Sequence, residues 1–136
     1  MKKTSMTIFV DASAFVAMIA GEADGEQLME RLMQDADPIW SAMTEWETVV
    51  ALCRSYHYPI ERARQEVQDT AHAAVLRRVE IGSDESRIAL DTYHRYGKGR
   101  HPAKLNMGDC FAYACAHTNN ATLLYKGDDF ARTDLR

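Results

Sequence analysis

The sequence is short of the features that mark several protein classes. No apolar run approaches the roughly 18–20 residues that span a bilayer, so we expect no membrane segment. Asp11 interrupts the apolar stretch that follows the basic N-terminus, which argues against a cleavable signal peptide. Three cysteines, at positions 53, 110 and 115, give an odd count without metal-ligand spacing. We therefore expect no disulfide framework and no zinc site, but reduced thiols in a cytoplasmic protein.

An excess of basic residues is also missing. The chain has 16 Lys and Arg residues against 20 Asp and Glu residues, a net charge of −4. Proteins that bind nucleic acid by electrostatics alone are usually basic, so this balance disfavours that class. It does not disfavour an enzyme whose site is built from carboxylates.

What is present fits one globular domain. A chain of 136 residues with 46% hydrophobic and 26% charged residues can bury roughly 70% of the surface that its unfolded form exposes. We expect a single domain over residues 1–136, with residues 1–5 as an N-terminal extension, and we find no internal repeat or linker.

The order of apolar patterns predicts an α/β fold. Short strands are expected at residues 8–10, 38–40, 79–81 and 121–125. Helical periodicity is expected between them, at residues 12–20, 22–34, 44–58, 60–79, 84–96 and 108–117. Alternating strands and helices favour a layered domain with a mainly parallel sheet of four to five strands.

Carboxylates stand at the junctions of these elements. Asp11 follows the first strand, Glu47 lies early in the helix after the second, Asp109 opens the last long helix, and Asp128 and Asp129 follow the last strand. In parallel sheets, sites gather beyond the carboxyl ends of the strands. Several clustered carboxylates need a cation to stay ionised, and Mg²⁺ or Mn²⁺ prefers such oxygen ligands.

Each acid also has a helix-capping interpretation. Asp11 can cap the helix at Ala12, Glu47 can close a capping box with Thr44, and Asp109 can lie in a first turn. Either of the two last aspartates can cap a short final helix. The spacing alone leaves the metal site and the caps as alternatives.

Four segments resemble the PIN-domain proteins of the VapC toxin type. The segments are residues 8–14 (IFVDASA), 41–47 (SAMTEWE), 96–114 (YGKGRHPAKLNMGDCFAYA) and 123–134 (LLYKGDDFARTD). The third is long and specific, and the resemblance extends over essentially the whole chain. It implies a three-layer α/β/α fold and a Mg²⁺-dependent endoribonuclease, with Mn²⁺ as a substitute, that acts as the toxin of a toxin–antitoxin pair.

The resemblance also implies roles for individual residues. Asp11 and Asp109 correspond to the principal metal ligands, and Glu47 to the third acid, with Glu45 as a rival two positions early. The fourth acid is Asp128, with Asp129 as the alternative. Water would attack phosphorus and leave a 5′-phosphate and a 3′-hydroxyl.

Substrate and partners follow from the same resemblance and from a basic block. Glycines and cations next to Asp109 suit RNA phosphates, and the substrate-binding candidates are Ser13, Lys98, Arg100 and Lys104. The expected partners are an RNA such as tRNA, a VapB-like antitoxin and a second copy of the chain. Leu28, Leu32 and Met33 could serve such contacts, although we expect at least two of them in the core. A non-catalytic RNA- or partner-binding module of the same fold is the alternative, whereas an aspartate-nucleophile phosphatase is disfavoured because Ser13 stands where a second aspartate is needed.

Overall fold

The structure is a computed structural model, and it describes residues 6–34, 36–99, 101–127 and 133–134. Residues 1–5, which were expected to form an extension, lie outside these ranges, as do Arg100, Asp128 and Asp129. The elements in chain order are β1 (Met6–Val10), α1 (Ala12–Ala20), α2 (Gly25–Met33), β2 (Ala36–Trp40), α3 (Ala42–Tyr56), α4 (Ile60–Ala73), β3 (Arg77–Arg78), α5 (Ser83–Tyr96), α6 (Met107–Thr118) and β4 (Thr122–Leu124).

The sheet has the order β3-β2-β1-β4, and every strand pair within the described residues is parallel. In the register, Phe9 is opposite Ile39 on one side and Leu123 on the other. The predicted α/β class and parallel sheet are therefore confirmed, with four strands in the described part of the chain.

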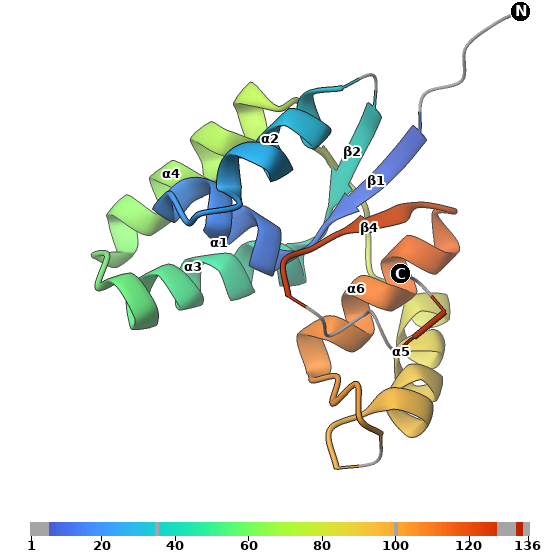
Figure 1. The fold of residues 1–136 in the computed structure, drawn as a ribbon. Helices are drawn as coiled ribbons and strands as arrows, with labels where there is room; N and C mark the ends of the chain where they lie inside the picture. Colours follow the sequence, from blue (N-terminus) through green and yellow to red (C-terminus); the bar gives the residue numbers. More distant parts are fainter. Residues whose placement is uncertain (1–5, 35, 100, 128–132, 135–136) are drawn as a thin grey trace, which may run out of the picture.

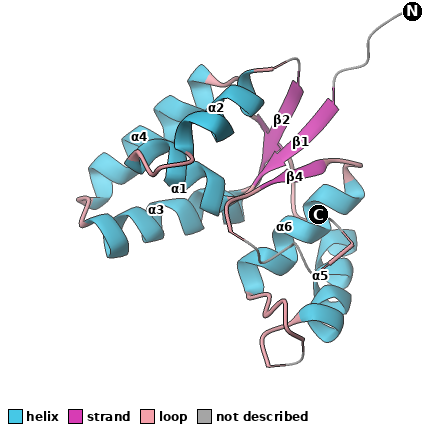
Figure 2. Cartoon of the chain, viewed as in Figure 1, coloured by secondary structure: helices cyan, strands magenta, loops and turns pink. Residues whose placement is uncertain are grey.

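Helices cover both faces of this sheet, so the predicted three layers are also confirmed. Helices α1 to α4 lie on one face, and α5 and α6 lie on the other (Figures 1 and 2). Because successive strand residues point to opposite faces, neighbours divide between two cores. Phe9, Ile39 and Leu123 pack with residues of α5 and α6. The opposite core holds Ile8, Val10, Trp40 and Leu124, together with residues of α1 to α4.

Two predicted boundaries are wrong in the middle of the chain. The strand expected at residues 79–81 lies earlier, as β3 at Arg77–Arg78. Val79 is outside this strand, but its amide donates a hydrogen bond to the Trp40 carbonyl at 2.8 Å. The helix expected to continue to Val79 ends at Ala73, and Val75 takes a left-handed φ of 55°. A β-branched residue seldom adopts this conformation, so no local sequence signal marked the end of the helix.

The start of α3 differs from the expected one. Ser41, not Thr44, is the N-cap, and Thr44 is its partner in a reciprocal capping box. The Thr44 amide donates to Ser41 Oγ at 3.3 Å, and the Ser41 amide donates to Thr44 Oγ1 at 3.2 Å. The capping box expected between Thr44 and Glu47 is therefore wrong, and Glu47 lies in the second turn.

Burial decides several single-residue expectations. Leu32 is buried and Leu28 is half-buried against the same core, as expected for at least two of the three apolar residues, whereas Met33 is exposed. The three cysteines are free thiols, with Cys110 and Cys115 buried. In the described part of the chain, no helix is both long and apolar enough to cross a membrane.

Candidate active site

A cavity of about 340 Å³ opens beyond the carboxyl end of β1, where the first turns of α1 and α6 meet the side of α3. Three acids predicted from the sequence, Asp11, Glu47 and Asp109, line it together. The other lining residues are Ala12, Ser13, Val16, Glu22, Ala51, Asn106 and Lys126. The junctions of three separate elements thus bring together carboxylates that lie far apart in the sequence.

Asp11 is held in place from two sides. Its amide donates to the Leu124 carbonyl at 2.9 Å, which ties the end of β1 to the end of β4. Its side chain caps α1, because Oδ2 accepts from the Ser13 amide at 3.1 Å and from Ser13 Oγ at 2.7 Å. Ser13 Oγ in turn accepts from the Lys126 amide at 2.9 Å. Ser13 therefore contacts Asp11 directly and joins it to the chain that leaves β4.

Asp109 is oriented by the start of α6. Asn106 is the N-cap, and its side-chain oxygen accepts from the Asp109 amide at 2.9 Å. Asp109 Oδ2 accepts from the Asn106 amide at 3.1 Å, which completes a capping box. The expected place of Asp109 in a first turn is confirmed. Asp109 is only 8% exposed and Asp11 only 5%, so both carboxylates are largely withdrawn from solvent.

Glu47 carries the clearest electrostatic signal in the cavity. Burial of its carboxyl group and the nearby negative charge of Asp11 raise its pKa from 4.5 to about 7. Its carboxylate lies directly against Gly108 in the first turn of α6. Within the described residues, no group donates a hydrogen bond that would offset this shift. Glu47 is therefore buried next to a second carboxyl group, and this placement disfavours its charged form.

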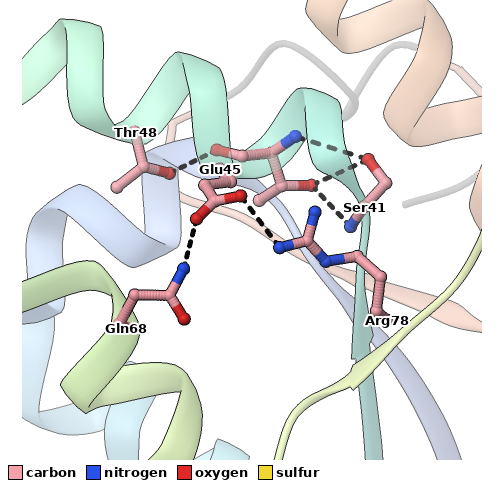
Figure 3. Close-up of polar contacts among 6 residues, drawn as sticks. Ser41, Glu45, Thr48, Gln68 and Arg78 are labelled. Atoms are coloured by element: carbon pink, nitrogen blue, oxygen red, sulfur yellow. Dashed lines mark hydrogen bonds and ion pairs between the residues drawn. The ribbon is translucent and has the colours of Figure 1, made fainter. Parts of the chain in front are cut away.

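Glu45, the rival acid, is not among the residues that line the cavity, and it points toward Gln68 of α4 and Arg78 of β3 (Figure 3). Its Oε1 accepts from Arg78 Nη2 at 2.8 Å, and its Oε2 accepts from the Gln68 side-chain amide. Arg78 also lies over the Trp40 ring, 4.3 Å from its centroid. Glu45 thus joins α3 to α4 and to the edge strand, and the geometry favours Glu47 as the acid of the cavity.

Lys126, the cation among the described lining residues, is engaged with other acids. Lys126 Nζ lies 2.5 Å from Glu22 Oε1 and 3.6 Å from Asp24 Oδ1. Glu22 also accepts a hydrogen bond from the Tyr56 hydroxyl, and its pKa is lowered mainly by the bond from Lys126. This network forms the rim of the cavity and leaves the charge on Glu47 uncompensated by Lys126.

Two of the basic candidates are surface residues. Lys98 and Lys104 are exposed on the loop between α5 and α6, and neither lines the cavity. Arg100 belongs to the same loop, and it lies outside the described residues, as do both candidates for the fourth acid, Asp128 and Asp129. In the described residues, no three His, Cys, Asp or Glu side chains converge closely enough to form a ready-made metal site.

Two polar lining residues, Glu22 and Asn106, were not among the predicted site residues. Glu22 follows the glycine that ends α1 and belongs to no motif, so only the structure, through its place in the cavity and its ion pair with Lys126, identifies it. Asn106 was readable in principle, because an Asn three positions before an acid at a helix start is a capping signature.

Comparison with known proteins places these features in a family. The PIN domain family model matches residues 8–135. A VapC ribonuclease of Rhizobium meliloti is 41% identical, with 93% of this chain and 98% of that protein covered. Two solved structures show the same fold at low identity. Mycobacterium tuberculosis VapC20, described as a sarcin–ricin loop cleaving toxin, matches with a TM-score of 0.74 at 20% identity, covering 95% of this chain and 96% of that one.

The second structure is a toxin–antitoxin complex from Klebsiella pneumoniae, with a TM-score of 0.66 at 19% identity, covering 93% of this chain and 92% of that one. Family model, full-length relatives and fold agree with each other and with the three acids gathered in the cavity. The chain belongs to the PIN-domain family and, within it, to the VapC ribonucleases.

Proposed function

We propose that this chain is a Mg²⁺-dependent endoribonuclease, with Mn²⁺ as a substitute, and the toxin of a VapBC-type pair. The observation that carries the proposal is the single cavity lined by Asp11, Glu47 and Asp109, in which the pKa of Glu47 rises to about 7. A carboxylate cluster of this kind, in a VapC ribonuclease relative, supports phosphodiester hydrolysis. We also treat residues 1–136 as one functional domain, with residues 1–5 as an extension.

The donor set fits a hard divalent cation. Asp11 and Asp109 are the proposed ligands, because their carboxylates are buried, oriented by helix caps and located on the same cavity. Mg²⁺ is commonly held by one or two carboxylates and keeps several waters, so a ready-made cage of three side chains is not required. When bound, the ion lowers the pKa of water and offsets charge on the phosphoryl group.

The other steps of the proposed reaction are assigned to side chains of this protein. Ser13 fixes the rotamer of Asp11 through its hydroxyl, and the capping box fixes that of Asp109. Glu47, whose carboxyl group lines the same cavity as the two proposed ligands, accepts a proton from the attacking water. Attack at phosphorus breaks the P–O3′ bond, the proton passes to O3′, and the products carry a 5′-phosphate and a 3′-hydroxyl. We assign the fourth acid to Asp128, with Asp129 as the alternative.

The proposed substrate is a structured RNA such as tRNA. Lys98, Arg100 and Lys104 belong to the loop that leads into α6, whose first turn carries Asp109. They are proposed to contact phosphates outside the cavity, where cations increase affinity without sequence preference. Ser13 is proposed to contact the phosphate nearest to Asp11.

The proposed partners are a VapB-like antitoxin and a second copy of the chain, in the cytoplasm. The solved complex from Klebsiella pneumoniae supports the first, and free cysteines are compatible with a reducing compartment. Exposed apolar side chains support a protein contact, since Trp46 is 59% and Met33 60% exposed. Light scattering after gel filtration, with and without the antitoxin, measures both assemblies.

Cleavage of total RNA by the purified chain tests the enzymatic proposal. We expect cleavage with Mg²⁺ or Mn²⁺, none with EDTA, and a loss of at least roughly 100-fold in Asp109→Asn. Asp91→Asn, the same change on the exposed face of α5, is the matched control and keeps full activity. Full activity in Asp109→Asn would refute the proposal. RNA binding without cleavage in any metal would favour the non-catalytic module instead.

A further inference from the structure

Gly108 is the second residue of α6, buried between the N-cap Asn106 and the proposed ligand Asp109. A Cβ placed on Gly108 would fall closer than 3.0 Å to three atoms of Glu47: Cδ and both carboxylate oxygens. The Glu47 carboxylate therefore occupies the space that any other residue at position 108 would fill with its own side chain.

The backbone does not explain the glycine. Among the described residues, the glycines with a left-handed φ are Gly21, Gly99 and Gly127, and a Cβ on any of them meets nothing within 4 Å. Gly108 has the reverse properties, since its φ is not in the left-handed region but the space at its Cα is taken. Glycine is therefore needed at position 108 because a neighbouring side chain fills the space, and not because of the backbone conformation.

We propose that Gly108 is a positioning residue, which seats the Glu47 carboxylate against the first turn of α6. Helices α3 and α6 contact each other, and at this contact the side chain of Glu47 approaches the backbone next to Asp109. The inference deepens the proposed function, because it rests on Glu47 being an acid of the reaction. It adds that the placement of Glu47 depends on the absence of a single methyl group.

Gly108→Ala tests the inference without threatening the fold. Alanine favours helix over glycine, and the obstructing atoms are the end of a flexible side chain, so the carboxylate can move aside. We expect Tm to stay equal or rise, the Mn²⁺ affinity measured by calorimetry to fall roughly 10-fold, and RNA cleavage to fall roughly 100-fold. Gly82→Ala at the start of α5 is the matched control, because its Cβ would meet only Glu85 Oε1 at 3.4 Å.

A double-mutant cycle separates positioning from a general structural effect. In a Glu47→Ala background the space at position 108 is vacant, so adding Gly108→Ala is expected to change Mn²⁺ affinity and cleavage by less than about 2-fold. Losses that multiply in the double variant would overturn the inference. If Gly108→Ala does not fold, recovery of folding in Gly108→Ala/Glu47→Ala supports the inference, and failure to recover overturns it.

A structure of the Gly108→Ala variant provides a readout that needs neither metal nor RNA. We expect the Glu47 carboxylate to be displaced from α6, and an unmoved carboxylate would overturn the inference. If the unsubstituted chain neither binds Mn²⁺ nor cleaves RNA, the proposed function fails, while this displacement still decides the role of Gly108.

Discussion

Replacing Glu47 by glutamine should stabilise the metal-free protein at alkaline pH, although it should abolish most activity. The pKa of Glu47 is about 7 in the folded chain, against an ordinary 4.5, because the carboxyl group is buried beside Asp11. Between these two pH values the native state binds more protons than the unfolded state does. The free energy of unfolding therefore falls as pH rises through this window and levels off above pH 7.

The magnitude follows from the size of the shift. At 1.36 kcal/mol per pH unit, the full difference corresponds to about 3 kcal/mol of lost stability at pH 8. The carboxylate is partly exposed, so solvent screening reduces this figure to about 1–2 kcal/mol. Glutamine has nearly the same shape and no charge, so Glu47→Gln removes the penalty. For a chain of this size, that gain raises Tm by about 3–8 °C.

Thermal unfolding in EDTA at pH 5 and pH 8 measures the effect. We expect the difference in Tm between Glu47→Gln and the unsubstituted chain to be clearly larger at pH 8. Glu45→Gln, two positions earlier on the same helix, is the matched control. It loses an ion pair to Arg78 and should be destabilised by no more than about 1 kcal/mol. Equal or lower stability of Glu47→Gln at pH 8 would refute the assigned environment of this carboxyl group.

Two further predictions concern the fold. Gly25→Ala should lower the free energy of unfolding in urea by about 1–3 kcal/mol. The new Cβ would lie 2.5 Å from the Ala17 carbonyl oxygen, a backbone atom that cannot move aside. Unchanged stability would contradict this close packing of α2 on α1. The thiols should differ in reactivity, because burial raises the pKa of Cys110 to about 11 and that of Cys115 to about 12. A thiol-reactive dye at pH 8 should label the half-buried Cys53 and leave these two unlabelled in the native state, and rapid labelling of all three would contradict their burial.

The sequence could predict the parts of this molecule that obey one simple rule. In a parallel sheet the carboxyl ends of neighbouring strands share an edge, so an acid directly after a strand is placed by topology alone. Asp11 satisfies this rule. Glu47 and Asp109, which lie in the first two turns of their helices, line the same cavity as Asp11. The apolar run at residues 8–10 is buried on both faces, which made β1 the clearest strand in the sequence.

The edge of the sheet could not be read in this way. β3 consists of two arginines, both exposed, and it is held by groups from other elements. Arg77 pairs with Asp37 at 2.7 Å, while Arg78 pairs with Glu45 and lies over Trp40. Hydrophobic periodicity cannot detect a strand whose exposed side chains pair with charged residues far away in the sequence. The strand was therefore predicted at the apolar residues Val79 and Ile81 instead.

For these acids, capping a helix and lining the cavity are not alternatives. Asp11 caps α1 and Asp109 closes the capping box of α6, and both also line the cavity. A cap fixes the rotamer of a carboxylate, and a fixed carboxylate loses less conformational entropy when it binds an ion. Glu47 differs because Ser41 and Thr44 already cap α3. Its longer side chain remains available to reach across to Gly108 on a neighbouring helix, while capping contacts in their own helices orient the two aspartates.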